Sequence, residues 1–261
     1  MSQGNVFLRR EQYSIADSHD RSCAITRNMI TGKIYNSRWI LERALRDHAL
    51  RINQSLVKAA SEQLQKFIPL IRSATELDSL RGLEGEAAAA YFGAFDELIL
   101  SQKVDFIFDG RNRRPPQDNV NAMLSFAYAL LANDCAAALE AVGLDAYVGF
   151  LHRDRPGRKS LALDLEEELR APFADRLVLT LINNRIIQDK HFDRQESGAV
   201  LLNDNGRKLF LKHWQEKKRD ENTHPFLKEK LPWRLVPYVQ SLLLARYIRG
   251  DIDEYPPFLW K

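Results

Sequence analysis

The sequence predicts a mainly α-helical, multi-helical domain that spans residues 1–261 and carries one small β-hairpin. Apolar residues recur three and four positions apart over most of the chain, which is the period of an amphipathic helix. The connectors between these segments are short and polar, and one pair of short segments around a turn has the pattern of strands. At 261 residues with 45% hydrophobic content, the chain is long enough to bury a large core.

The first hundred residues are expected to form helices at 20–48 and 53–72, with Thr75 as the N-cap of a third. In the third helix Leu80, Glu84 and Tyr91 share one face, so the carboxylate of Glu84 is expected to point inward. An inward carboxylate requires a cation or strong hydrogen-bond donors.

Two glycines flank this acid. Gly82 and Gly85 each cost a helix interior about 1 kcal/mol relative to alanine, which indicates that something approaches this backbone. A metal, a nucleic acid or another helix would satisfy the pattern. The alternative is a core ion pair between Glu84 and an arginine, and the segment alone leaves both interpretations open.

A basic loop at 109–116, with two adjacent prolines, precedes a long helix expected at 118–142. That helix carries Asn121, Ser125 and Tyr128 as a polar row, which faces either water or a site. The rest of the chain is expected to form a helix from 160 to about 187 kinked at Pro172, a hairpin of 191–194 with 198–202, and helices at 203–219 and 232–249.

Composition excludes several classes of protein. The net charge of +3 and pI near 8.8 are too balanced to indicate a nucleic-acid-binding protein by themselves. Cys23 and Cys135 are far apart in helical segments, which favours reduced thiols over a disulfide or zinc site. No apolar stretch of membrane-spanning length and no signal-peptide pattern were found, so we expect no membrane association and a cytoplasmic location.

A second group of chemically active residues begins at His152. It precedes a basic loop and a helix in which Asp164 and Glu167, three positions apart, project from one face. One imidazole with several carboxylates forms a nitrogen and oxygen site, which suits Mg²⁺ or Mn²⁺ better than zinc held by thiolates. The alternatives are a solvated acidic helix face and a structural histidine.

The sequence contains, in this order, the short motifs GNVFLRR at 4–10, GKI at 32–34, NSR at 36–38, LRGLEG at 80–85, RPP at 114–116, NVNA at 119–122, LSF at 124–126, GFLH at 149–152, LALDLEE at 161–167 and YPPFLW at 255–260. Taken together, they resemble the CRISPR-associated endonuclease and integrase number one, and the ending is most similar to the type I-C branch. The resemblance extends over nearly the whole chain.

This resemblance implies a helical catalytic domain with a metal ion, Mg²⁺ or Mn²⁺, bound by Glu84, His152 and Glu167, while Asp164 supports the site. It also implies that short foreign DNA is inserted into the CRISPR array through attack of a 3′ hydroxyl on a phosphodiester. The family acts as a homodimer bridged by CRISPR-associated protein number two, on double- and single-stranded DNA. The basic residues expected to contact DNA phosphates are Arg111, Arg113, Arg114, Arg153, Arg155, Arg158 and Lys159.

One departure from the family pattern is expected to matter. Family members usually begin with a small β-rich domain that builds the dimer, and this sequence starts at Met1 close to the helical part, so that domain is expected to be absent. Homodimer formation and partner binding are therefore in doubt. The alternative function is a catalytically silent helical DNA-binding or scaffold protein of the same ancestry.

Overall fold

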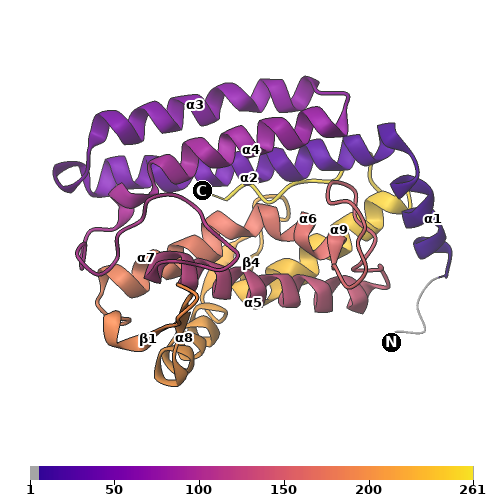
Figure 1. Cartoon of the computed structure of the whole chain (residues 1–261). Helices are drawn as coiled ribbons and strands as arrows, with labels where there is room; N and C mark the ends of the chain where they lie inside the picture. Colours follow the sequence, from indigo (N-terminus) through magenta and orange to yellow (C-terminus); the bar gives the residue numbers. More distant parts are fainter. Residues whose placement is uncertain (1–5, 261) are drawn as a thin grey trace.

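The computed structural model describes residues 6–260, which form two packed layers of helices (Figure 1). One layer comprises α2 (His19–Asp47), α3 (Gln54–Ser73) and α4 (Leu77–Gly93). The second is built around α5 (Asn119–Val142), α6 (Ser160–Leu169), α7 (Arg176–Asn183) and α9 (Val236–Ile248). The predicted mainly α-helical class is confirmed. The start at Met1 and the first two residues of the 4–10 motif lie outside the described residues.

A helix that the sequence pattern did not predict, α1 (Val6–Ala16), packs against α2. Its buried residues Leu8, Gln12 and Ile15 have the four-and-three spacing of one helix face. The amide of Gln12 donates to the carbonyl oxygens of Asp145 (2.8 Å) and Val148 (2.9 Å). α1 therefore braces the connector that leads to His152.

The start of α4 differs from the prediction. Thr75 is not the N-cap: the helix follows Glu76, whose side chain makes no capping hydrogen bond. The carboxylate of Glu76 instead lies 2.9 Å from Nε2 of His19, across the layer on α2. A contact between helices thus replaces local capping at this end.

The predicted disruption at Pro172 is present as a π-helical turn, Arg170–Asp175, between α6 and α7. Proline has no N–H to donate to the preceding turn, so the regular hydrogen-bond ladder is interrupted there. α7 ends at Asn183, earlier than expected. The wider turn brings the side chains of Arg170 and Asp175 to the interface between the layers.

Strands are confined to two small hairpins in the described chain. The predicted hairpin is confirmed as β1 (Phe192–Arg194) paired antiparallel with β2 (Val200–Leu202), and α8 (Asp204–Lys217) follows it. A second hairpin, β3 (Glu221–Thr223) with β4 (Lys230–Pro232), was not predicted. Short 3-10 turns complete the chain at η1 (Ala49–Arg51), η2 (Phe95–Leu98), η4 (Asp189–His191) and η5 (Trp233–Leu235).

α5 is the longest helix of the second layer. By length and composition it could cross a membrane, although half of its most apolar window is buried in the protein. A core helix passes the same test, so a single such helix is weak evidence for a membrane span. α5 packs against α6 and α9, as a core helix does. Cys135 on α5 and Cys23 on α2 are buried free thiols, as predicted.

The last described residues, 255–260, form a segment that we call the C-terminal strap. The side-chain amide of Asn36 on α2 donates to the carbonyl oxygen of Phe258 (2.7 Å), and its oxygen accepts from the backbone N–H of Trp260 (2.8 Å). On α6, Glu168 accepts hydrogen bonds from the hydroxyl of Tyr255 (2.7 Å) and the N–H of Phe258 (2.6 Å). The strap therefore ties the two helix layers together.

Candidate metal and DNA site

Two carboxylates from different helices meet one ammonium group between the layers. Nζ of Lys33 on α2 donates a short hydrogen bond to Glu84 on α4, and it lies 2.7 Å from Oε2 of Glu167 on α6. The side chains of Glu84, Lys33 and Glu167 are 24%, 11% and 3% exposed. The inward orientation predicted for Glu84 is observed, and its partner is a lysine rather than an arginine.

Close packing of α2 against α6 places Lys33 at this position. A Cβ atom added to the neighbouring Gly32 would lie 3.1 Å from Cγ of Glu168 and 3.2 Å from Cβ of Pro257. Glycine therefore permits the close approach of the α2 backbone to α6 and the strap. The next residue on α2, Lys33, is thereby brought to the carboxylate of Glu167.

Arg170 forms ion pairs with Glu166 and Glu167 on α6 and stabilises their ionised forms. It donates to Oε1 of Glu167 (2.5 Å) and, through Nε, to Oε1 of Glu166 (3.1 Å). Burial raises the pKa of Glu166 to about 7. Burial would also raise the pKa of Glu167, but Arg170 and Lys33 lower it to about 2. Glu167 is thus the acid that is fully ionised at neutral pH.

Asp164 holds the segment that presents His152. Its carboxylate accepts the backbone N–H groups of Phe150 (2.6 Å), Leu151 (3.0 Å) and His152 (3.0 Å), and Oδ1 lies 2.6 Å from Nδ1 of the imidazole. A Cβ at Gly149 would lie 2.8 Å from Oδ2, so glycine makes this arrangement possible. Because Nδ1 is engaged, Nε2 is the ring nitrogen left for a ligand.

The predicted metal ligands are brought to one region, although not into a closed metal site. Within residues 6–260, no three His, Cys, Asp or Glu side chains are grouped so that they could hold a metal ion, and Lys33 lies between Glu84 and Glu167. His152 is close enough to Glu167 for an electrostatic interaction between the two side chains to contribute to the lowered pKa of Glu167. Asp164 interacts with the His152 segment instead.

The donor types of the three predicted ligands suit a divalent ion, although their side chains are not grouped around one position in residues 6–260. Oε2 of Glu167 accepts no aligned hydrogen bond although it is buried beside Lys33, so it has a lone pair to offer. Two carboxylates and one imidazole form the oxygen-rich donor set that Mg²⁺ and Mn²⁺ accept. The ammonium group of Lys33 occupies the position between the two carboxylates, where their negative charges favour a cation.

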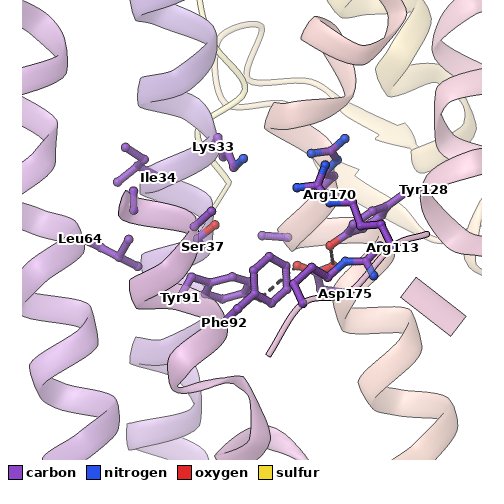
Figure 2. Close-up of a pocket in the computed structure, with 14 residues that line it drawn as sticks. Lys33, Ile34, Ser37, Leu64, Tyr91, Phe92, Arg113, Tyr128, Arg170 and Asp175 are labelled. Carbon is purple, nitrogen blue, oxygen red and sulfur yellow. Dashed lines mark hydrogen bonds between the residues drawn. The ribbon is translucent and has the colours of Figure 1, made fainter. Parts of the chain in front are cut away.

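Arg111 differs from the rest of its basic loop because it is folded against α5. It donates to Oδ1 of Asn121 (2.6 Å) and Oγ of Ser125 (3.1 Å), while its Nε has no partner in the described chain. Arg111, Lys33 and Arg170 line an adjoining cavity of about 30 Å³. Figure 2 shows Lys33 and Arg170 at this cavity. This volume holds one or two water molecules. The predicted polar row on α5 therefore faces the site.

A buried carboxylate closes the other side of this cavity. Asp175 accepts hydrogen bonds from the hydroxyls of Tyr128 (2.6 Å) and Tyr91 (3.0 Å), and Figure 2 shows these three side chains meeting. Burial raises the pKa of Asp175 to about 6. Arg170 stacks over the Tyr128 ring at 4.8 Å. The cavity is thus lined by the rings of Tyr91 and Tyr128 and by the guanidinium groups of Arg111 and Arg170.

The glycines beside Glu84 face open space. A Cβ added at Gly82 or Gly85 would meet no atom of the described chain within 4 Å. Packing of another helix from residues 6–260 therefore does not explain these glycines.

The other basic residues lie around the site at different depths. Arg113, Arg114, Arg153 and Arg155 are exposed, whereas Arg158 and Lys159 are half-buried. Two of them have partners within the protein: Arg153 pairs with Asp78 (3.3 Å), and Lys159 donates to Asn133 (3.1 Å). The alternative of a solvated acidic face on α6 is wrong, because the acids at 166–168 are all buried.

The model of the CRISPR associated protein Cas1 family matches residues 1–216 of the chain. The chain belongs to the Cas1 family. It is 52% identical to the CRISPR-associated endonuclease Cas1 2 of Rhodospirillum rubrum, covering 99% of this chain and 75% of that protein. It is 44% identical to the CRISPR-associated endonuclease Cas1 of Leptospira interrogans, covering 97% of this chain and 100% of the relative.

Solved structures share the fold. A Cas1 protein from Thermotoga maritima has a TM-score of 0.80 and 27% identity, covering 94% of this chain and 72% of that chain. A casposase bound to integration product has a TM-score of 0.84 and 24% identity, covering 98% of this chain and 68% of that chain. A partial Cas6-RT-Cas1–Cas2 complex has a TM-score of 0.82 and 24% identity, covering 100% of this chain and 74% of that chain. These two likenesses show the fold alone.

Sequence reasoning overlooked Lys33 as a site residue. On α2, Met29, Lys33 and Ser37 are spaced four apart, so the lysine interrupts the buried face of the helix. This signal is of the same kind as the one that singled out Glu84: a charge where the helix period requires an apolar residue. It was available, and it would have predicted the ion pair.

Proposed function

We propose that this Cas1-family chain is a metal-dependent DNA endonuclease and integrase of CRISPR adaptation, which inserts short foreign DNA into the CRISPR array. The observation that carries the proposal is the convergence of Glu84 and Glu167, from α4 and α6, on a single cation beside His152. The names of the relatives as endonucleases, and of one structural neighbour as bound to an integration product, support it.

Each residue has a distinct role in this proposal. Mg²⁺ or Mn²⁺, held by Glu84, His152 and Glu167, would polarise a phosphoryl oxygen and stabilise the departing 3′ oxygen. Asp164 orients the imidazole through Nδ1. Arg170 fixes the carboxylate of Glu167 and keeps it ionised.

The reaction proposed is a phosphodiester exchange. The 3′ hydroxyl of the incoming strand forms a new bond to phosphorus, and the bond to another 3′ oxygen breaks, so that the number of phosphodiesters is conserved. This step requires positioning and charge stabilisation more than covalent help from the protein. Arg111 and Arg170, which line the cavity beside the carboxylates, supply fixed positive charge near the phosphate.

The partners follow from the same proposal. DNA, single- and double-stranded, is the substrate, and the second adaptation protein, Cas2, is the partner named in structures of similar fold. A homodimer is the arrangement that the family resemblance implies, and we do not extend it to this chain; a cytoplasmic location stays an expectation. The competing function, a catalytically silent DNA-binding scaffold, is favoured by one observation: Lys33 already forms ion pairs with both carboxylates.

The test is a pair of matched substitutions on α4. Glu84→Gln removes a charged ligand, whereas Glu86→Gln alters an exposed acid two residues away. With Mg²⁺ or Mn²⁺, we expect E84Q to lower strand transfer and nicking of plasmid DNA at least about 100-fold, and E86Q to leave them unchanged. Both variants should bind DNA normally in EDTA. Wild-type activity in E84Q, or activity of the wild type in EDTA, would contradict the proposal.

A further inference from the structure

A second basic region lies in a groove near the end of α2, outside the carboxylate site. The groove has a volume of about 330 Å³ and is bounded by α2, η1 and α7. Three arginines line it: Arg43, Arg51 and Arg176. Among the described lining residues Asp47 alone is acidic, and it already pairs with Arg46 at 2.7 Å. The groove thus carries excess positive charge.

Two of these arginines share one aromatic ring. Cζ of Arg43 lies 4.9 Å and Cζ of Arg176 lies 4.5 Å from the centre of the Trp260 ring. Neither guanidinium forms an ion pair with a carboxylate in residues 6–260. The carboxylate of Asp220 acts electrostatically on Arg176, but it forms its ion pair with Lys217 (2.9 Å). Two like charges on one ring, without a carboxylate partner, leave an anion position unfilled by the described chain.

Because Arg176 is partly buried, an anionic partner would stabilise its charge more than at an exposed position. Burial and the neighbouring charge of Arg43 lower the pKa of Arg176 to about 10. A guanidinium in this setting is a strong donor to phosphate oxygens, because its planar fork matches their geometry and it is less hydrated than an ammonium. Asn183 and Thr180 add polar groups to the same wall.

The groove continues the face of α2 that reaches the carboxylate site. Lys33, Ser37, Ile40 and Ala44 are spaced four, three and four residues apart and therefore share one side of the helix. Lys33 and Ser37 line the cavity at the carboxylates, and Ile40 and Ala44 line the groove. Lys33 and Ala44, at the two ends of this row, lie about 16 Å apart along the helix, at 1.5 Å per residue.

We propose that this groove binds a phosphate group of a DNA strand, a few nucleotides away from the phosphate that lies at the carboxylates. The inference rests on the proposed function, since it takes DNA as the ligand. It adds a second anchor for the same strand. Two anchored phosphates define a line, whereas one leaves the strand free to turn about the metal site.

The test compares two double variants with the same loss of charge. Arg43→Gln with Arg176→Gln alters the groove, and Arg72→Gln with Arg246→Gln alters two exposed arginines on α3 and α9. Fluorescence anisotropy with single-stranded DNA is measured in EDTA over a salt series. The plot of log affinity against log salt should lose about 0.7 from its slope in the groove variant, the value for one phosphate contact on single-stranded DNA, and nothing in the control.

Each outcome decides between defined alternatives. An unchanged slope in the groove variant overturns the inference. Inorganic phosphate that raises the melting temperature of the wild type but not of the groove variant, with no change in DNA slope, indicates a free-anion site and also overturns it. A wild type without salt-dependent DNA binding refutes the proposed function itself. If circular dichroism shows that the groove variant is unfolded, Arg51→Gln replaces it, with an expected loss of about 0.7.

Discussion

Glu167 and Glu168 are neighbours on α6 and almost equally buried, yet they differ in charge. Glu167 faces Lys33 and Arg170, which lower its pKa to about 2 against the effect of burial. Glu168 faces the strap, and burial raises its pKa to about 8, although hydrogen bonds from Phe258, Tyr255 and Gln240 partly oppose this shift. Burial is common to both, so the presence of a counter-charge decides which acid is ionised.

The difference follows from the helix period and assigns a role to each acid. Successive side chains are rotated by about 100° on an α-helix, so Glu167 points to α2 and α4 while Glu168 points to the strap and α9. The ionised acid is suited to hold a cation. The neutral acid is suited to join uncharged donors, and it serves as a structural anchor.

The largest effect is expected from removing the counter-charge. Lys33→Met leaves Glu84 without a cation and Glu167 with Arg170 alone, and breaking a buried ion pair costs about 3 to 5 kcal/mol. Urea unfolding in EDTA should show this loss. Mn²⁺ should then stabilise K33M more than it stabilises the wild type, because no ammonium has to be displaced from between the carboxylates.

Lys58→Met is the matched control for that experiment. Lys58 is 71% exposed and lies 4.0 Å from Glu62, so its loss should cost less than about 1 kcal/mol and should not alter the response to Mn²⁺. An equal Mn²⁺ response in K33M and the wild type would show that Lys33 and the metal do not compete for one position.

A smaller effect is expected on the neutral side of α6. Glu168→Ala leaves the hydroxyl of Tyr255 and the N–H of Phe258 without an acceptor, at a cost of about 2 to 4 kcal/mol. Glu168→Gln retains a neutral acceptor of the same shape and should cost less than half as much. Urea unfolding near pH 6 measures both. If the two substitutions cost the same, Glu168 is ionised and the contrast with Glu167 fails.

The smallest effect is a change in the pH dependence of stability. Glu168 keeps its proton in the folded protein up to about pH 8, whereas the unfolded chain ionises near the usual value of 4.5. Unfolding therefore releases a proton between these values, and the free energy of unfolding falls as the pH rises. E168Q should reduce this fall. Glu166 and Asp175, with pKa values of about 7 and 6, preserve part of it.

Glu167 has the opposite sign. Its folded pKa of about 2 lies below the usual 4.5, so its stabilising contribution is complete above pH 4.5 and is lost as the pH falls toward 2. Unfolding curves in EDTA from pH 3 to pH 9 should show two changes in the free energy of unfolding: a loss in acid from Glu167 and a fall toward alkaline pH from Glu168. If the free energy of unfolding of E168Q fell with rising pH as much as that of the wild type, the assignment of a raised pKa to Glu168 would be contradicted.

The helical period was enough to predict much of this molecule. The long helices, the break at Pro172 and the inward direction of Glu84 all depend on local spacing, which a sequence displays directly. The motif at 161–167 also marked the two acids, and the structure separates them: Asp164 holds the His152 segment and Glu167 faces Lys33.

The remaining features depend on contacts between distant residues. The second hairpin was missed because β3 has no buried residue and β4 has one, so neither shows the alternation of a half-buried strand. Thr75 was a suitable cap by type, but Glu76 is engaged by His19, 57 positions earlier in the chain. No local pattern contains these pairings.

The strap has a consequence for the order in which the protein folds. Asn36 near the beginning of the chain is bonded to Trp260 near its end, and Glu168 is satisfied only when residues 255–258 are in place. Contacts across so many residues form late, because the loop that they close is costly in entropy. During synthesis, α2 and α6 stay without this tie until residues 255–260 have left the ribosome. The ion pair of Lys33 with Glu167, which joins the same two helices, is thus held in place by the strap only after the other described helices have been made.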